Sequence, residues 1–167
     1  MVNEKFKAML HYIISKCGSK PNVGKTVLYK LCYFSDFDFY ELYETKMTGA
    51  TYVHYPNGPA PQPFMEAVSS LVEAKLIRVD TADYMGREQQ KFISLKEPDM
   101  SSFSKEEIAA IDSAIERYSG YNASQISEIS HKDTPWAITG LYEPLDYEAV
   151  FYRDVDLSVR TYDDEDE

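Results

Sequence analysis

The sequence predicts an α+β fold that is mainly α: a single compact helical domain around a central helix, with a small β-hairpin. The first observation is residues 26–43, a stretch without Gly or Pro that is long enough for a helix of about five turns. The second is that apolar residues recur at steps of three and four in several other segments. The third is a pair of short, β-branched stretches, 76–79 and 91–95, with a polar segment between them.

Residues 26–43 are expected to form the central helix of the domain. Its apolar stripe consists of Val27, Leu28, Leu31, Phe34, Phe39 and Leu42. Such a stripe is typical of a helix that faces a core, and aromatic residues on the other faces indicate that neighbouring elements cover those faces too. Asp36 and Asp38 interrupt the apolar surface. Because a buried, unpaired carboxylate is costly, both need partners or water.

The first half of the chain predicts three further elements around that helix. Residues 3–16 predict a first helix, and Asn22 is the expected N-cap of the central helix. Residues 51–55 predict a short extended piece. The segment Asn57–Pro61 follows it as a rigid turn, because Gly adopts unusual φ values and each Pro restricts its own φ. Residues 63–75 then return to a helical period.

The two β-branched stretches predict a hairpin with its turn around residues 83–90. A helix followed by a two-stranded hairpin is the plan of a winged helix, so 63–95 predicts a winged-helix-like element. Later in the chain, Ser104 and Glu107 form a capping box that opens a helix reaching to residue 118. Residues 122–129 predict a shorter helix, and 145–157 predict at most one short helix.

Composition describes one soluble domain without a membrane span. The chain has 167 residues and a net charge of −11, of which five negative charges lie in 162–167, leaving −6 for residues 1–161. We therefore expect a domain at 1–161 and a disordered acidic tail at 162–167. No apolar run approaches the roughly 20 residues of a membrane span, and no signal-peptide pattern is present, so the expected location is the cytoplasm. Cys17 and Cys32 are expected to be free, buried thiols.

Gly24-Lys25-Thr26 looks like the end of a phosphate-binding loop, but the spacing is wrong. The motif requires Gly at position 19, which is Ser19, and it requires a preceding strand where this sequence has a helical period. The sequence therefore does not predict a nucleotide loop. No spacing typical of a metal site is present either, and we expect no metal.

Four segments together resemble a known family. They are Lys30–Asp36 (KLCYFSD), Thr48–Tyr52 (TGATY), Tyr55–Pro61 (YPNGPAP), and Ile129–His131 with Pro135-Trp136. In this order they resemble the Panacea domain, the SocA-like antitoxin family that also includes phage-associated proteins, over roughly residues 5 to 145. Residues 1–167 are not expected to include the helix-turn-helix domain that is fused to some relatives, so the resemblance does not imply transcriptional autoregulation by that route.

The resemblance implies an antitoxin, often encoded in a prophage, that binds and neutralises a toxin protein from the adjacent gene. It implies no enzymatic activity and no cofactor. It leaves open whether the antitoxin occludes the toxin or delivers it to a cellular protease. It also implies a set of family framework residues that could contact the partner: Tyr33, Asp36, Tyr40, Tyr52, Gly58, Pro59, Pro61, His131, Pro135 and Trp136. We expect the Gly58–Pro61 corner to pack near Trp136, and His131 to hydrogen-bond a carboxylate, with Asp36 as the best candidate, or a backbone carbonyl.

Two alternatives remain open at this stage. An enzyme could use His131 with Asp36, or His54, as acid–base groups, although the histidines are scattered and no nucleophile motif is present. A prophage DNA-binding regulator could use the helix and hairpin at 62–95. The acidic body argues against it, because non-specific DNA affinity comes from cations on phosphates. Its cations would be Lys75, Arg78, Arg87 and Lys91.

Overall fold

A computed structural model describes residues 3–162 of the chain. Helices account for 48% of the described residues and strands for 16%, in two small antiparallel hairpins, so the predicted class of α+β, mainly α, is confirmed. Within the described residues, no helix is long and apolar enough to cross a membrane.

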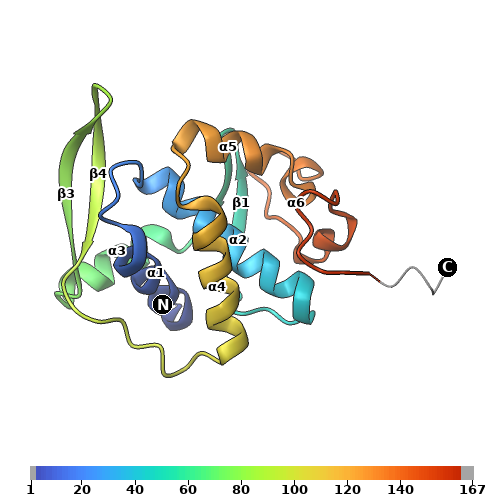
Figure 1. The fold of residues 1–167 in the computed structure, drawn as a ribbon, viewed down its shortest axis with the longest axis horizontal. Coiled ribbons are helices and arrows are strands. Elements are labelled where there is room, and N and C mark those ends of the chain that lie inside the picture. The colour runs from blue at the N-terminus through green and yellow to red at the C-terminus, as the bar shows by residue number, and fades with distance from the viewer. Residues whose placement is uncertain (1–2, 163–167) are drawn as a thin grey trace.

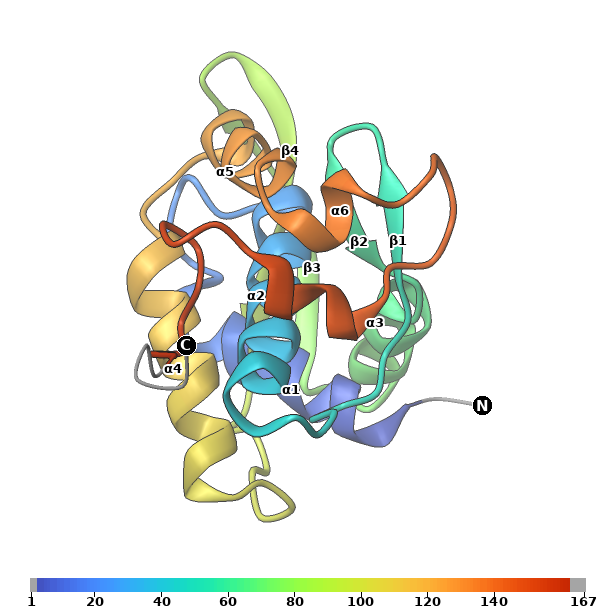
Figure 2. The ribbon, with the colours of Figure 1, turned by 90° about the vertical axis from the view of Figure 1, so that its right-hand side faces the viewer.

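The central helix is α2, Lys25–Tyr43, and the first helix is α1, Glu4–Cys17. Most of the side chains on α2 are buried, and the helix contacts α1, both hairpins and the later helices (Figure 2). The predicted N-cap was wrong: Gly24 caps α2, and the Asn22 amide instead donates hydrogen bonds to the carbonyls of Ser119 and Tyr121. Asn22 thereby ties the loop before α2 to the end of a helix about a hundred residues later.

The first hairpin consists of β1, Tyr52–Tyr55, and β2, Gly58–Pro61. The sequence predicted a rigid turn at Asn57–Pro61, but most of that segment is a strand. His54 uses its backbone N–H and carbonyl on the opposite side, toward Glu143 and Tyr142. Pro59 is paired with His54, and Pro61 is paired with Tyr52, whose carbonyl likewise accepts from outside the hairpin, from Leu145. At both positions β2 therefore needs no N–H donor. That placement is what allows two prolines in one short strand.

The second hairpin follows a helix, as the winged-helix plan predicted. Helix α3 is Phe64–Glu73, and the strands are β3, Ile77–Tyr84, and β4, Arg87–Ser94. The turn is shorter than predicted, with only Met85 and Gly86 between the strands, both at positive φ. Two residues of this conformation form a tight hairpin whose twist matches the strands. In Figure 1 the hairpin stands at one edge of the molecule and the C-terminal helical segments lie at the other.

The C-terminal third is helical and closes over α2. It contains α4, Lys105–Tyr118, α5, Ala123–His131, α6, Thr134–Ala137, and a 3₁₀ helix, η1, Tyr147–Tyr152. The capping box at Ser104 and Glu107 is present as predicted. Tyr162, the first residue of the predicted acidic tail, donates a hydrogen bond to Glu41. Residues 163–167 lie outside the described residues, so the disordered tail stays a prediction.

Candidate functional site

The predicted framework residues fall into two groups, and the first lies on α2 and on the elements around it. Tyr33, Asp36 and Tyr52 are buried, as are Gly58, Pro59, Pro61 and Pro135, whereas Tyr40 is half-buried against the rings of Tyr147 and Phe151. Their positions are those of supports for the fold rather than of a contact surface.

Asp36 is held by Thr48 and Tyr52. Its Oδ1 accepts the Thr48 backbone N–H at 3.0 Å, and its Oδ2 accepts the Thr48 hydroxyl and the Tyr52 hydroxyl, each at 2.6 Å. Burial raises the pKa of Asp36 to about 6, although these hydrogen bonds pull it down. Both carboxylate oxygens are thus occupied by local donors, and the predicted hydrogen bond from His131 to Asp36 is wrong.

The second group is a stack of three rings around Trp136. The indole lies between His54, at a centroid distance of 3.9 Å, and His131, at 4.4 Å, with both imidazoles nearly parallel to it. The indole Nε1–H donates to the Tyr55 carbonyl, and His54 Nδ1–H donates to the Trp136 carbonyl. The stack joins the end of β1 to α5 and α6. His54 therefore has a structural role in this stack.

His131 contributes a ring surface and no hydrogen bond. Its buried Nε2 is the one side-chain nitrogen or oxygen within residues 3–162 that is buried without a partner. The expected bond to a carboxylate or a carbonyl is absent, and Asp36 and His131 do not form an acid–base pair. The positions of Asp36 and His131 therefore do not support the enzyme hypothesis that pairs them. Within residues 3–162, no group of His, Cys, Asp and Glu side chains is arranged to hold a metal ion.

A buried ion cluster that the sequence did not predict lies next to the stack. The guanidinium of Arg153 is fully buried and contacts Asp38 at 2.8 Å, Glu41 at 3.0 Å and Asp133 at 2.8 Å. Tyr33 donates its hydroxyl proton to Asp133 at 2.6 Å. Burial disfavours the charged guanidinium, but the carboxylates around it, Asp38 first, raise the pKa of Arg153 well above its ordinary value.

The Arg153 cluster fixes the position of α6. Asp133 is the N-cap residue of α6, and Asp38 and Glu41 lie on α2, so one side chain from near the C-terminus connects the two helices. The only sequence signal was Asp38 itself, a carboxylate on an apolar helix that needed a partner. Arg153 lay in a segment without a clear period.

Four exposed apolar side chains lie at the end of β1 and in the loop after α6, the two segments that the Trp136 stack joins. Tyr55, Ile138, Leu141 and Tyr142, which we call the aromatic patch, are 44%, 67%, 55% and 61% exposed. The rings of Tyr55 and Tyr142 touch edge to face at 5.6 Å, and the Tyr142 N–H bonds the His54 carbonyl. Figure 2 shows the loop after α6 running beside β1. The aromatic patch is therefore mounted on the hydrogen-bonded hairpin and the ring stack.

The cations of the DNA-binding alternative do not form a common surface. Lys91 is buried and donates to the backbone carbonyls of Lys20 and Val23, and Arg78 pairs with Asp80 on its own strand. A protein that binds in a groove of DNA needs a basic surface that the phosphates can reach. The helix-and-hairpin shape is present, but two of its four cations are engaged elsewhere.

Comparison with known proteins gave one match. The family model described as "Antitoxin SocA-like, Panacea domain" matches residues 28–137, from within α2 to the end of α6. The match contains the β1–β2 hairpin and the Trp136 stack. It confirms the resemblance found in the sequence, over a shorter range than 5–145. No curated protein and no solved structure shows a significant match.

Proposed function

We propose, because this chain belongs to the SocA-like antitoxin family with a Panacea domain, that it neutralises a cognate protein toxin by binding it directly. The family match over residues 28–137 is the observation that carries the proposal. Membership of an antitoxin family indicates a non-enzymatic role and, in general, a toxin as partner. The gene beside this one is the expected source of the toxin.

The aromatic patch is the surface that we propose for toxin contact. Exposed aromatic and aliphatic side chains anchor protein interfaces, and Tyr offers a large contact area with little entropy to lose. Single exposed apolar residues are ordinary on a protein surface, but the patch holds four of them on adjacent segments. Two of the four, Tyr55 and Tyr142, already touch before any partner arrives.

The support beneath the patch favours binding without rearrangement. Trp136 is stacked on both faces and hydrogen-bonded through its indole N–H, and β1 is bonded on one side to β2 and on the other to residues 142–145. A surface that is already ordered has less conformational freedom to lose on binding. The framework residues of the family would then act by holding the patch, since Trp136 bonds the Tyr55 carbonyl and stacks on His131.

The charge of the chain indicates a basic partner. The net charge of −11 attracts a cationic protein to this chain and speeds their encounter at low salt. We further propose that neutralisation takes place in the cytoplasm. Occlusion of the toxin and delivery to a protease are both compatible with a direct complex.

Co-expression with the neighbouring reading frame tests the proposal. We expect growth to be rescued from the toxin and the two chains to co-purify. Leu141→Asp, which places a charge in the aromatic patch, should weaken rescue and co-purification without lowering the thermal midpoint. Val155→Asp is the matched control, because Val155 is 88% exposed outside the patch. Absence of both rescue and complex would refute the antitoxin role. Equal effects of the two substitutions would refute the proposal that the aromatic patch contacts the toxin.

A further inference from the structure

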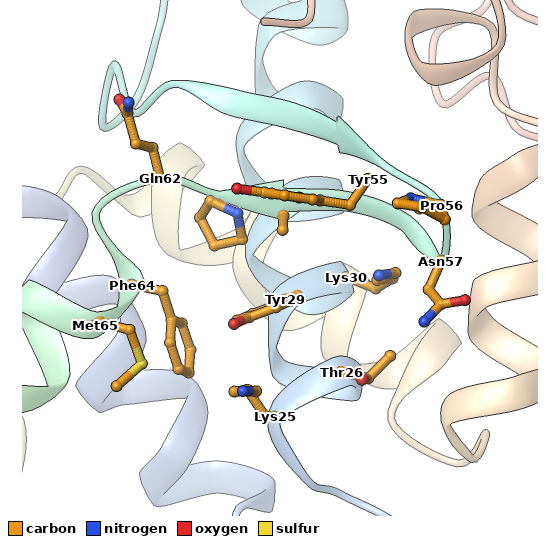
Figure 3. A pocket seen from close by; sticks show the side chains of 13 residues that line it. Lys25, Thr26, Tyr29, Lys30, Tyr55, Pro56, Asn57, Gln62, Phe64 and Met65 are labelled. Carbon is orange, nitrogen blue, oxygen red and sulfur yellow. The ribbon is translucent and has the colours of Figure 1, made fainter. Parts of the chain in front are cut away.

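A cavity of about 470 Å³ lies between the start of α2, the β1–β2 hairpin and the start of α3 (Figure 3). It is separate from the aromatic patch except for Tyr55, which borders both. Its apolar wall includes Tyr29, Pro61, Phe64 and Met65, and its polar side includes Lys25, Lys30 and Asn57. A cavity of this size with an apolar wall and a few converging polar groups is typical of a small-molecule site.

Lys30 is the unusual residue in this cavity. Its side chain is only 1% exposed, yet no hydrogen-bond acceptor and no carboxylate within residues 3–162 is paired with its ammonium group. Its nearest recorded partner is the ring of Tyr29, whose centroid is 5.8 Å from Nζ. Burial lowers the pKa of Lys30 to about 8, so at neutral pH the group is still mostly charged. Within residues 3–162, only His131 Nε2 is fully buried without a partner, so the Lys30 nitrogen itself is open to the cavity that the residue lines. A mostly buried cation without a counter-charge is unfavourable.

The backbone around Lys30 is shaped to admit this side chain. A Cβ at Gly58 would lie 2.8 Å from Lys30 Cε and 3.2 Å from Nζ. The bare glycine of β2 therefore leaves the space that the ammonium occupies at the cavity. Figure 3 shows Lys30 directed from α2 toward the turn that carries Asn57.

The start of α2 adds a second source of positive potential. Gly24 caps the helix without a side chain, and no acidic residue lies in the first turn. The amino end of a helix carries a partial positive charge, and its first N–H groups are free to bind an anion. Lys25 and Thr26, the first two residues of α2, line the cavity beside Lys30.

We propose that this cavity binds a small organic carboxylate, with the carboxylate held by Lys30 and Lys25 at the start of α2 and an apolar body against Tyr29, Phe64 and Met65. The ligand supplies the counter-charge that Lys30 lacks. A monoanion suits the site better than a phosphate, because phosphate sites use several converging donors and often Arg, whereas no Arg lines this cavity and about half of its wall is apolar. The recessed position of Lys30 favours a small free molecule over the surface of a docked protein.

Phenylacetate is the probe for this site, and the purified full-length chain is the sample. With ¹³C-labelled lysine, the Lys30 Cε signal is assigned by its loss in Lys30→Met and followed by NMR during titration. We expect phenylacetate to shift this signal saturably, with a Kd in the millimolar range or tighter, and to raise the pKa of Lys30 from about 8 toward 10.5. Phenylacetamide, which has the same ring without the charge, should do neither.

Two comparisons make the experiment decisive. Lys30→Met should lower the affinity for phenylacetate at least tenfold, whereas Lys105→Met, which removes the same charge from an exposed residue of α4, should leave it unchanged. The wild-type pKa measurement stands even if Lys30→Met does not fold. Equal responses to phenylacetate and phenylacetamide, tighter binding of inorganic phosphate, or no saturable shift would overturn the proposal. These results do not test toxin binding, because the surface proposed for it shares only Tyr55 with the cavity.

Discussion

Replacing Arg153 with Met removes the one cation within residues 3–162 that touches Asp38, Glu41 and Asp133 together. Asp38 keeps Arg117, and Glu41 keeps its bonds from Ser158, Val159 and Tyr162. Asp133 keeps only Tyr33 after losing both of its bonds from the guanidinium. Breaking a buried ion pair from one side costs about 3–5 kcal/mol, because a charge is left buried without compensation. That is a large part of the roughly 5–15 kcal/mol by which a domain is stable.

Urea unfolding measures this loss, with Arg160→Met as the control. Arg160 pairs with Glu44 at the surface, where both side chains are at least one-third exposed, and also donates to the Glu41 backbone carbonyl. The pair contributes at most about 1 kcal/mol and the hydrogen bond about 1 kcal/mol. We expect the loss in Arg153→Met to shrink at acid pH. Without the guanidinium the pKa values of Asp38 and Glu41 rise, and protonation then removes the uncompensated charge. A loss no larger than that of Arg160→Met, or one independent of pH, would refute the reasoning.

Two further substitutions test the supports of α2 and of the hairpin. Burial raises the pKa of Asp36 from 3.8 to about 6, so its contribution to stability is full below pH 4 and is lost as the pH rises through 6. In urea titrations, the free energy of unfolding of the wild type relative to Asp36→Asn should therefore fall by about 3 kcal/mol between about pH 4 and pH 7. A difference in unfolding free energy that does not change with pH would contradict the raised pKa of Asp36. Gly58→Ala should cost about 2–4 kcal/mol, because its Cβ would lie 2.4 Å from Ser130 Oγ at a φ of +114°. Gly49→Ala, at a φ of +71° with open space around it, should cost only about 1 kcal/mol, and equal losses would show that the close approach at Gly58 is unimportant.

Local signals in the sequence predicted the helices well. The capping box at Ser104 and Glu107 and the apolar character of residues 26–43 depend on neighbours a few positions apart, and the structure retains both. The four family segments also sufficed to identify the Panacea domain, which the family match confirms. Signals of this kind survive folding because they are satisfied within one element.

Pairings between distant segments could not be predicted. Asp38 required a partner, but Arg153 lies 115 residues away, and nothing in the sequence singles it out from the other cations. The expected bond between His131 and Asp36 was wrong, because Thr48 and Tyr52 already satisfy Asp36. The strand character of Gly58–Pro61 was missed for a related reason. A proline is tolerated in a strand where the neighbouring strand needs no N–H from it. The register of the hairpin decides which positions these are.

Hydrogen–deuterium exchange of the purified chain, with and without the purified toxin from the neighbouring gene, tests the central claim most directly. The account predicts a stoichiometric complex in which amides of residues 52–61 and 136–142 become protected, while those of the β3–β4 hairpin tip do not. A chain that gives the same exchange pattern with and without toxin would contradict the claim that this protein acts by direct binding. Protection confined to the β3–β4 hairpin would contradict the choice of the aromatic patch.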